Sequence, residues 1–147
     1  MLTLESSFGP TLCGEWSQAD TDCTPYLNNV GAGTRWEGTL TSADRGVSVL
    51  SPACPSKSDA CSCAEANADP SKYSDTYKQW LKVNAEAQMA SYETGWGWFY
   101  WTWRTEGAAQ WDWRRGMELG TLPKKVWERE FNCTGRLPDF EGLSENY

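Results

Sequence analysis

The sequence predicts an α/β fold, and three stretches of the chain indicate it. Residues 12–16 form a short segment that favours a strand, and residues 98–103 form an aromatic segment that favours another. Between them, residues 69–92 repeat apolar side chains at spacings of three and four, which is typical of a helix. The predicted order is strand, helix, long loop, helix, strand and helix. Two strands are too few to close a sheet, so this α/β fold is incomplete as it stands.

The first half of the chain contains short predicted elements and a long connection. Residues 1–11 are expected to be an irregular lead-in. Thr24 and Pro25 favour the start of a helix, because Thr can cap it and Pro suits its first position. Glycines at both ends of residues 31–33 would end that helix early. Residues 40–68 are rich in Ser, Ala, Asp, Pro and Cys, and we expect a long loop tied by disulfides.

The second half contains the clearest periodic pattern. A helix is expected to begin at Asp69 and Pro70 and to run to about Tyr92, where the glycines of residues 95–97 follow. The side chains expected on its buried face are Tyr73, Tyr77, Trp80, Leu81 and Ala85.

The aromatic segment of residues 98–103, WFYWTW, has no charge. It predicts a strand buried on both faces, as in parallel sheets that are covered by helices. After it, residues 111–123 are expected to form a loop with a short helix, and residues 134–147 a polar tail.

Composition excludes several classes of function. The net charge is −7, whereas nucleic-acid binding requires clustered Lys and Arg, so no nucleic-acid partner is expected. The chain has no histidine, which excludes Ser–His–Asp and Cys–His chemistry and removes the commonest zinc ligand. We expect no metal and no cofactor. No apolar run is long enough to cross a membrane, and MLTLESSFGP lacks the basic and apolar regions of a signal peptide.

Six cysteines, at positions 13, 23, 54, 61, 63 and 133, indicate an oxidising compartment. A four-cysteine zinc site would need paired C-x-x-C motifs, which the chain lacks, so disulfides are favoured over a metal. The Asn132-Cys133-Thr134 sequence is an N-glycosylation motif, which points in the same direction.

Exposed aromatic rings on the second strand would suit a sugar ligand. Strand alternation places Phe99, Trp101 and Trp103 on one face. These rings are either core or a platform for the apolar faces of a sugar, whose hydroxyl groups nearby polar side chains would bind. Glu106, just beyond the strand, and Asn28 or Asn29 are candidates for that polar role; the alternative for each is an ordinary surface or turn residue.

Glu15 is the candidate catalytic residue, because the first predicted strand ends there and a polar segment follows. Catalytic side chains of α/β enzymes lie at the carboxyl ends of parallel strands. The alternative is an ordinary surface carboxylate.

Four blocks of the sequence, in order, resemble the C-terminal part of the fungal exo-β-1,3-glucanases of glycoside hydrolase family 5. They are GEWSQADTDC, LNNVGAGTRWEG, EAQMASYE and GWFYWTWRTEGAAQWDWRRGMELGTLP. The resemblance covers about residues 13–133 and implies the seventh and eighth β/α units of a (β/α)8 TIM barrel. Residues 12–133 would then be part of a catalytic domain, between the lead-in of residues 1–11 and the tail of residues 134–147.

The resemblance also implies roles for individual residues. Glu15 matches the catalytic nucleophile of a retaining hydrolysis that releases terminal glucose from β-1,3-glucan or a related β-glucoside. Trp101 matches the indole that lines the subsite for that glucose, with Trp103 beside it on the same strand. Cys23 matches a cysteine that pairs with Cys61 or Cys63, of which Cys63 is preferred. Cys133 matches a cysteine near the C-terminus of the family's proteins, and the disulfide partner of that cysteine lies upstream of the nucleophile.

One essential part of that family's machinery is missing from the sequence. The family's acid/base is the Glu of an Asn-Glu-Pro motif, and the chain contains no such motif. We therefore do not expect the chain to be active by itself, and the N-terminal portion of such a barrel becomes an expected partner. The resemblance implies an extracellular or cell-wall location. The alternatives are a non-catalytic secreted glucan-binding protein or a disulfide-tied structural protein.

Overall fold

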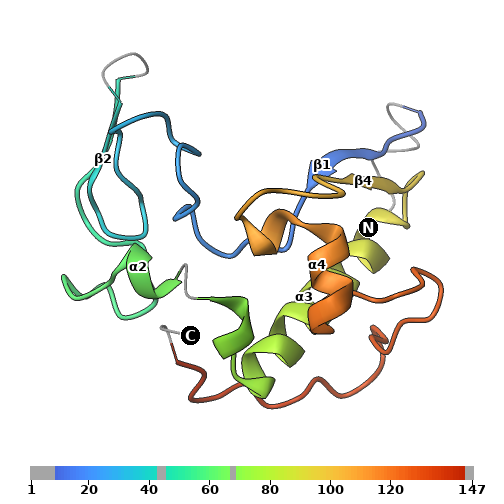
Figure 1. The fold of residues 1–147 in the computed structure, drawn as a ribbon. Coiled ribbons are helices and arrows are strands. Elements are labelled where there is room, and N and C mark those ends of the chain that lie inside the picture. Colours follow the sequence, from blue (N-terminus) through green and yellow to red (C-terminus); the bar gives the residue numbers. More distant parts are fainter. Residues whose placement is uncertain (1–8, 43–45, 67–68, 145–147) are drawn as a thin grey trace. The chain divides into compact units, whose positions relative to one another are not determined.

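The computed structural model describes residues 9–42, 46–66 and 69–144 and has an α/β architecture (Figure 1). The chain divides into two compact units, which are described separately. The first contains residues 1–18 and 75–141, and the second contains residues 19–74 and 142–147.

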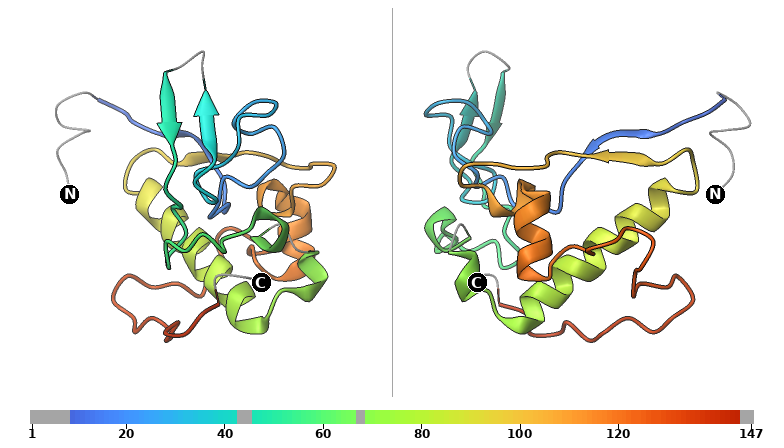
Figure 2. Two further views of the ribbon diagram at one scale, coloured as in Figure 1. Left: turned by 90° about the vertical axis from the view of Figure 1, so that its left-hand side faces the viewer. Right: turned by 45° about the vertical axis from the view of Figure 1, so that its right-hand side comes forward.

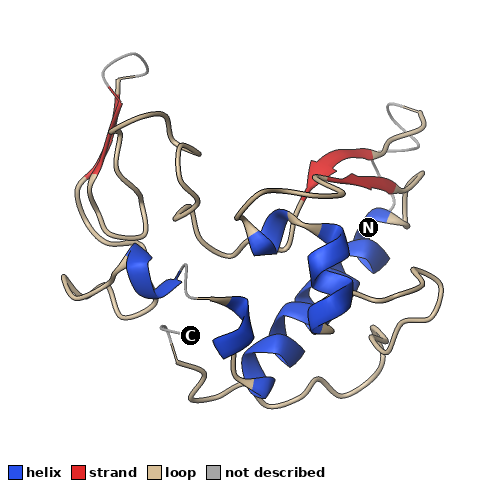
Figure 3. Ribbon diagram, viewed as in Figure 1, coloured by secondary structure: helices blue, strands red, loops and turns tan. Residues whose placement is uncertain are grey.

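The first unit contains the longest helix of the described chain and a parallel pair of strands (Figure 3). Its elements are β1 (Cys13–Trp16), α3 (Asp75–Tyr92), β4 (Trp98–Tyr100), the 3-10 helix η3 (Ala109–Trp111) and α4 (Trp113–Leu119).

Strands β1 and β4 pair in parallel, as the α/β prediction requires. Cys13 lies opposite Trp98, and Trp16 lies opposite Tyr100, with an irregularity in the register between them. The pairing extends before the strands, where the Trp96 N–H donates to the Thr11 carbonyl at 2.7 Å. The two strands are far apart in sequence, and α3 precedes β4 by a short turn.

The core of this unit lies on one face of the strand pair. Its buried members are Trp16, Ala85, Met89, Trp113 and Leu122. The Trp16 ring meets Tyr100 edge-on at a centroid distance of 5.0 Å. Helix α4 approaches Leu122 closely at Gly116, where a Cβ would lie 2.6 Å from a Leu122 methyl group. A larger residue at position 116 would therefore force the helix away from the core.

The buried face of α3 follows the predicted spacing, with a later start. Tyr77, Leu81 and Ala85 are fully buried, whereas Trp80 is only half-buried. Residues 70–72 form a separate 3-10 helix, because the chain is extended again at Tyr73 (ψ 130°) before α3 begins at Asp75.

The aromatic segment differs from its prediction in two respects. Strand β4 ends at Tyr100, and Trp101 and Trp103 lie in bends. The prediction of burial on both faces is wrong, because Phe99, Trp101 and Trp103 are 64%, 56% and 60% exposed. The physical reason is that the described helices of this unit pack with Trp16 and Tyr100 on one face only.

The second unit consists mainly of turns and an antiparallel hairpin, which is seen as two arrows in the left view of Figure 2. Its elements are β2 (Leu40–Ser42), β3 (Val47–Val49), α2 (Cys63–Ala66) and η2 (Pro70–Lys72). The predicted loop over residues 40–68 thus contains a hairpin and a helical turn.

The helix predicted at Thr24 and Pro25 is wrong, because these residues belong to a series of turns. Tyr26 and Asn29 have φ values of 66° and 86°, and such left-handed backbone cannot continue a right-handed helix. Thr24 and Pro25 are residues that favour a helix start, but the residues that follow them form turns.

Two disulfides join the loops of the second unit. Cys23 bonds with Cys63, the pair preferred from the resemblance, and Cys54 bonds with Cys61. Cys23, Cys54 and the Trp36 ring form the buried cluster of this unit. Such bridges are typical of proteins that fold in oxidising compartments. Cys13 and Cys133, in the first unit, are free thiols.

Candidate functional site

Glu15 lies at the carboxyl end of β1, on the face opposite the core. Its neighbour Trp16 is buried in the core, whereas Glu15 is exposed, so the Glu15 side chain points away from the core. Glu15 is exposed, and its carboxylate makes no hydrogen bond or ion pair with any described residue. It is therefore available to a ligand.

Exposed aromatic rings lie in and just after β4, the strand that pairs with β1. Trp16 and Tyr100 pair in register and contact each other on the core side. Phe99, which precedes Tyr100 in β4, and Trp101, the first residue after the strand, are both more than half exposed. The first unit thus has an exposed carboxylate near the end of one strand of the parallel pair and exposed rings at the end of the other.

Backbone hydrogen bonds hold the segment of residues 101–103 from both sides. The Trp101 N–H donates to the Trp16 carbonyl at 2.8 Å, which ties the segment to β1. The Thr102 N–H donates to the Trp111 carbonyl at 2.6 Å, and its own carbonyl accepts from the Trp113 N–H at 2.9 Å. The Trp101–Thr102 peptide bond is cis. The two exposed indoles therefore stand on a fixed backbone although the strand has ended.

Asp112 is a buried carboxylate that sequence reasoning missed. It caps α4 by accepting from the Arg115 N–H at 2.8 Å, and its other oxygen accepts from the Thr105 N–H at 2.9 Å. These bonds fix the turn that carries the exposed Glu106. An Asp just before a helix is a recognised capping signal, so its position could have been found from sequence.

Tyr100 lies near this carboxylate on the core side. Burial raises the pKa of its phenol, and the negative charge of Asp112 raises it further, although a backbone hydrogen bond at Gln18 opposes them. The hydroxyl donates to the Gln110 carbonyl at 2.8 Å. Tyr100 is thus a neutral structural phenol.

Asn28, the predicted sugar-binding amide, belongs to the second unit and is engaged by its own loop. Its Nδ2 donates to Asp22 Oδ2 at 2.7 Å and to the Gly33 carbonyl at 3.3 Å. Its Oδ1 accepts from Arg35 Nη1 at 3.3 Å. The structure therefore gives Asn28 a part in loop organisation, and sugar binding by this residue stays a prediction.

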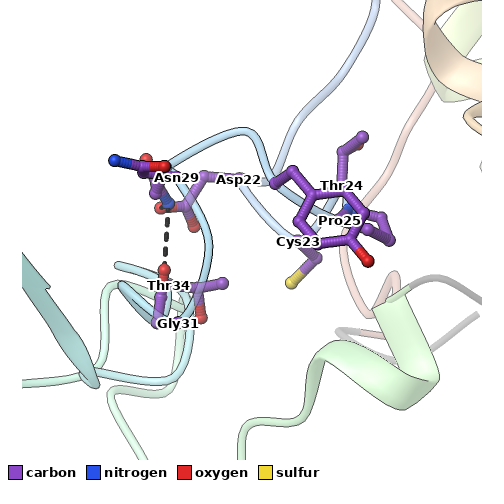
Figure 4. A pocket seen from close by; sticks show the side chains of 10 residues that line it. Asp22, Cys23, Thr24, Pro25, Asn29, Gly31 and Thr34 are labelled. Atoms are coloured by element: carbon purple, nitrogen blue, oxygen red, sulfur yellow. Dashed lines mark hydrogen bonds between the residues drawn. The ribbon is translucent and has the colours of Figure 1, made fainter.

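The loop around Asn28 encloses an open hollow of about 270 Å³. Figure 4 shows Asn29, Gly31 and Thr34 along one part of its lining and Cys23, Thr24 and Pro25 along another. Asp22 also lines this hollow, but its carboxylate is committed to the loop.

The described residues offer no group of three or more Cys, Asp or Glu side chains that could hold a metal ion. Within the same residues, none of the helices combines the length and the apolar character needed to cross a bilayer. The candidate site therefore consists of Glu15 and the neighbouring rings.

The chain is similar to fungal proteins named as probable glucan 1,3-beta-glucosidase D. It is 54% identical over 147 residues to the protein of Aspergillus terreus, 56% over 144 residues to that of Aspergillus clavatus and 55% over 144 residues to that of Aspergillus fumigatus. The predicted resemblance to fungal glucan 1,3-β-glucosidases is confirmed.

These similarities cover 97–99% of this chain but only 17% of the length of each glucosidase relative. No protein-family model matches the chain. The candidate site of the first unit thus lies within a segment shared with the glucosidase relatives, and most of the length of those relatives has no counterpart in this chain.

Proposed function

We propose that this chain contributes the nucleophile and part of the sugar platform to a retaining β-1,3-glucosidase. The observation that carries the proposal is the free Glu15 carboxylate near the end of β1, the strand whose last residue, Trp16, is hydrogen-bonded to the exposed Trp101. The names of the similar proteins supply the substrate class, a β-1,3-linked glucan or a related β-glucoside.

The reaction would proceed through a covalent glycosyl-enzyme ester. A Glu15 oxygen attacks the anomeric carbon, the bond to the leaving oxygen breaks, and that oxygen takes a proton from an acid. Water then cleaves the ester after losing a proton to the same group, and glucose is released with its original configuration. Ring stacking on Trp101 would orient the terminal sugar for this attack.

The proton donor would come from outside this chain. Retaining hydrolysis places two carboxyl groups about 5–5.5 Å apart, and the sequence lacks the Asn-Glu-Pro motif that supplies the acid/base in the family it resembles. Loss of general acid–base catalysis typically costs about 10²–10⁴-fold in rate. We therefore expect the isolated chain not to hydrolyse glucan.

The fold proposal follows from the same strands. β1 and β4 would be the seventh and eighth strands of a (β/α)8 barrel, with α3 as the helix before the last strand. A barrel requires eight strands in a closed ring. The two strand edges would then pair with other strands of the barrel. A secreted or cell-wall location accords with the two disulfides.

A chimera tests the role of Glu15 in a complete enzyme. The matched segment of the Aspergillus terreus relative would be replaced by this chain, to which it is 54% identical. We expect the chimera to release glucose from laminarin and Glu15→Gln to lower kcat/KM by more than about 10³-fold, because an amide cannot form the ester.

The matched control is Glu128→Gln, which removes an exposed carboxylate that pairs with Lys125 on the surface. This variant should keep the activity of the chimera. An active Glu15→Gln chimera would overturn the proposed nucleophile, and glucan hydrolysis by the isolated chain would overturn the need for an external proton donor.

A second candidate function is glucan binding without catalysis, which the three exposed rings of residues 99–103 favour. Pull-down of the isolated chain on insoluble β-1,3-glucan measures it. If the rings alone bind the sugar, Trp101→Ala should release the chain, since stacking is lost, and Glu15→Gln should stay bound. Retention of Trp101→Ala would exclude this platform.

A further inference from the structure

The irregular segment after α4 carries a modification motif that the proposed reaction does not use. Asn132, Cys133 and Thr134 form an N-x-Thr sequence. None of the five other asparagines of the chain is followed two residues later by Ser or Thr. We propose that Asn132 is an N-glycosylation site.

The motif lies on the surface, where an attached glycan has room. Asn132, Cys133 and Thr134 are all exposed and lie outside the helices and strands of the first unit. They form a compact turn, in which the Gly135 N–H donates to the Asn132 carbonyl at 2.9 Å. A sequence motif alone would be equally compatible with a buried site, so this exposure is what favours modification.

The hydrogen bonds of the turn leave the reacting atom free. Asn132 Oδ1 accepts from the Thr134 N–H at 3.0 Å and from Thr134 Oγ1 at 2.9 Å. Asn132 Nδ2 has no hydrogen-bond partner within the described part of the chain. The side-chain oxygen is thus held by the turn, while modification of the nitrogen of this exposed residue would break no hydrogen bond of the described chain.

The donor would be an oligosaccharide linked to a polyprenyl diphosphate. A bond forms between Asn132 Nδ2 and C1 of the first sugar, and the bond from C1 to the diphosphate oxygen breaks. Nδ2 loses one proton, and the polyprenyl diphosphate leaves with the electron pair of the broken bond. No oxidation or reduction takes place.

The test is secretion of the whole chain from a yeast behind an added signal sequence, with mass measured before and after peptide N-glycosidase treatment. We expect an enzyme-sensitive increase in mass for the wild type. Asn132→Gln and Thr134→Ala should both lose it, because one removes the acceptor and the other removes the recognised hydroxyl. Treatment in heavy-oxygen water should label Asn132 as Asp in its peptide.

Cys133→Ser is the matched control, since it changes the middle residue and keeps the motif, and it should stay modified. If a variant is not secreted, the same masses are measured on denatured material from the cell's secretory compartment. An unmodified wild type, or a mass increase that survives both Asn132→Gln and Thr134→Ala, would overturn the assignment.

Discussion

Asp22 organises the loop of the second unit through several hydrogen bonds. Its carboxylate accepts from the backbone N–H groups of Arg35 and Trp36 at 2.7 and 3.0 Å, and from Asn28 Nδ2 at 2.7 Å. Burial alone would raise the pKa of Asp22, but these three bonds and the charge of Arg35 outweigh it and hold the pKa below 3.8. The ionised form is therefore bound more tightly in the folded loop than in the unfolded chain.

This pKa gives the loop a defined acid sensitivity. Because the folded pKa lies below the unfolded one, the contribution of Asp22 to stability is complete above the ordinary value of 3.8 and is lost as the pH falls through the folded value. Asp22→Ala should cost about 1–3 kcal/mol at neutral pH, because two backbone N–H groups lose their acceptor. Amide hydrogen exchange at Arg35 and Trp36 should become faster at neutral pH. The protection of these two amides relative to the unfolded chain should also change less in the variant than in the wild type as the pH falls.

The exposed Asp59 provides the control, since Asp59→Ala removes a carboxylate of the same unit that accepts no hydrogen bond in the described chain. Exchange that stays slow at both amides in Asp22→Ala would contradict the role assigned to Asp22.

For single residues, the sequence predicted the kind of side chain at the candidate site better than the hydrogen bonds that the side chains make. The strand pattern predicted a common face for Trp101 and Trp103; both rings are exposed, but they lie beyond the end of β4, so the common face stays a prediction. The hydrogen bond from Asn28 to Asp22 depends on turns that contain left-handed residues, and the geometry of such turns cannot be predicted from a hydrophobic pattern. The structure does not test catalysis by Glu15, so its role remains a proposal.

Helix α3 holds the segment after α4 through one buried carboxylate. Glu86 is fully buried, and its Oε2 accepts from the backbone N–H groups of Glu130 and Phe131 at 2.9 and 2.7 Å. At the end of the helix, hydrogen bonds to Glu93 from Arg129 and Trp98 overcome the effect of burial and lower the pKa of that carboxyl group. One position on α3 and one directly after it thus fix residues 129–131.

Removing the first of these carboxylates should loosen the segment. Glu86→Ala leaves two backbone N–H groups without acceptors and should lower the free energy of unfolding of the first unit by about 1–3 kcal/mol. Urea unfolding measures the loss, and limited proteolysis should cut the segment of residues 129–131 sooner.

Glu118→Ala on α4 is the comparison, because it removes exposed ion pairs worth less than about 1 kcal/mol. Equal losses in the two variants would show that the burial of Glu86 does not matter.

Elements long enough to repeat their hydrophobic pattern several times were predictable, and short elements were not. The spacing of Tyr77, Leu81 and Ala85 predicted the buried face of α3, because an 18-residue helix repeats the pattern several times. The signal at Thr24 and Pro25 covers one turn only, so the left-handed residues that follow override it. The lack of charge in residues 98–103 predicts burial on both faces, which is wrong because burial depends on neighbouring elements that a single segment does not specify.

At the scale of the whole molecule, the chain has two small units and 17% of the length of its glucosidase relatives. The strand pair of the first unit has one packed face and one aromatic exposed face. The α/β class was predictable from the order of elements. The two-unit division was not, because it depends on contacts between residues far apart in sequence.

The two disulfides of the second unit are nested, since the Cys54–Cys61 bridge lies inside the span closed by Cys23–Cys63. Lys57 is exposed and lies within both spans. A protease that cuts after Lys57 would therefore leave the two pieces of the polypeptide joined by two covalent bonds. The nicked protein would keep its full mass until both bridges are reduced.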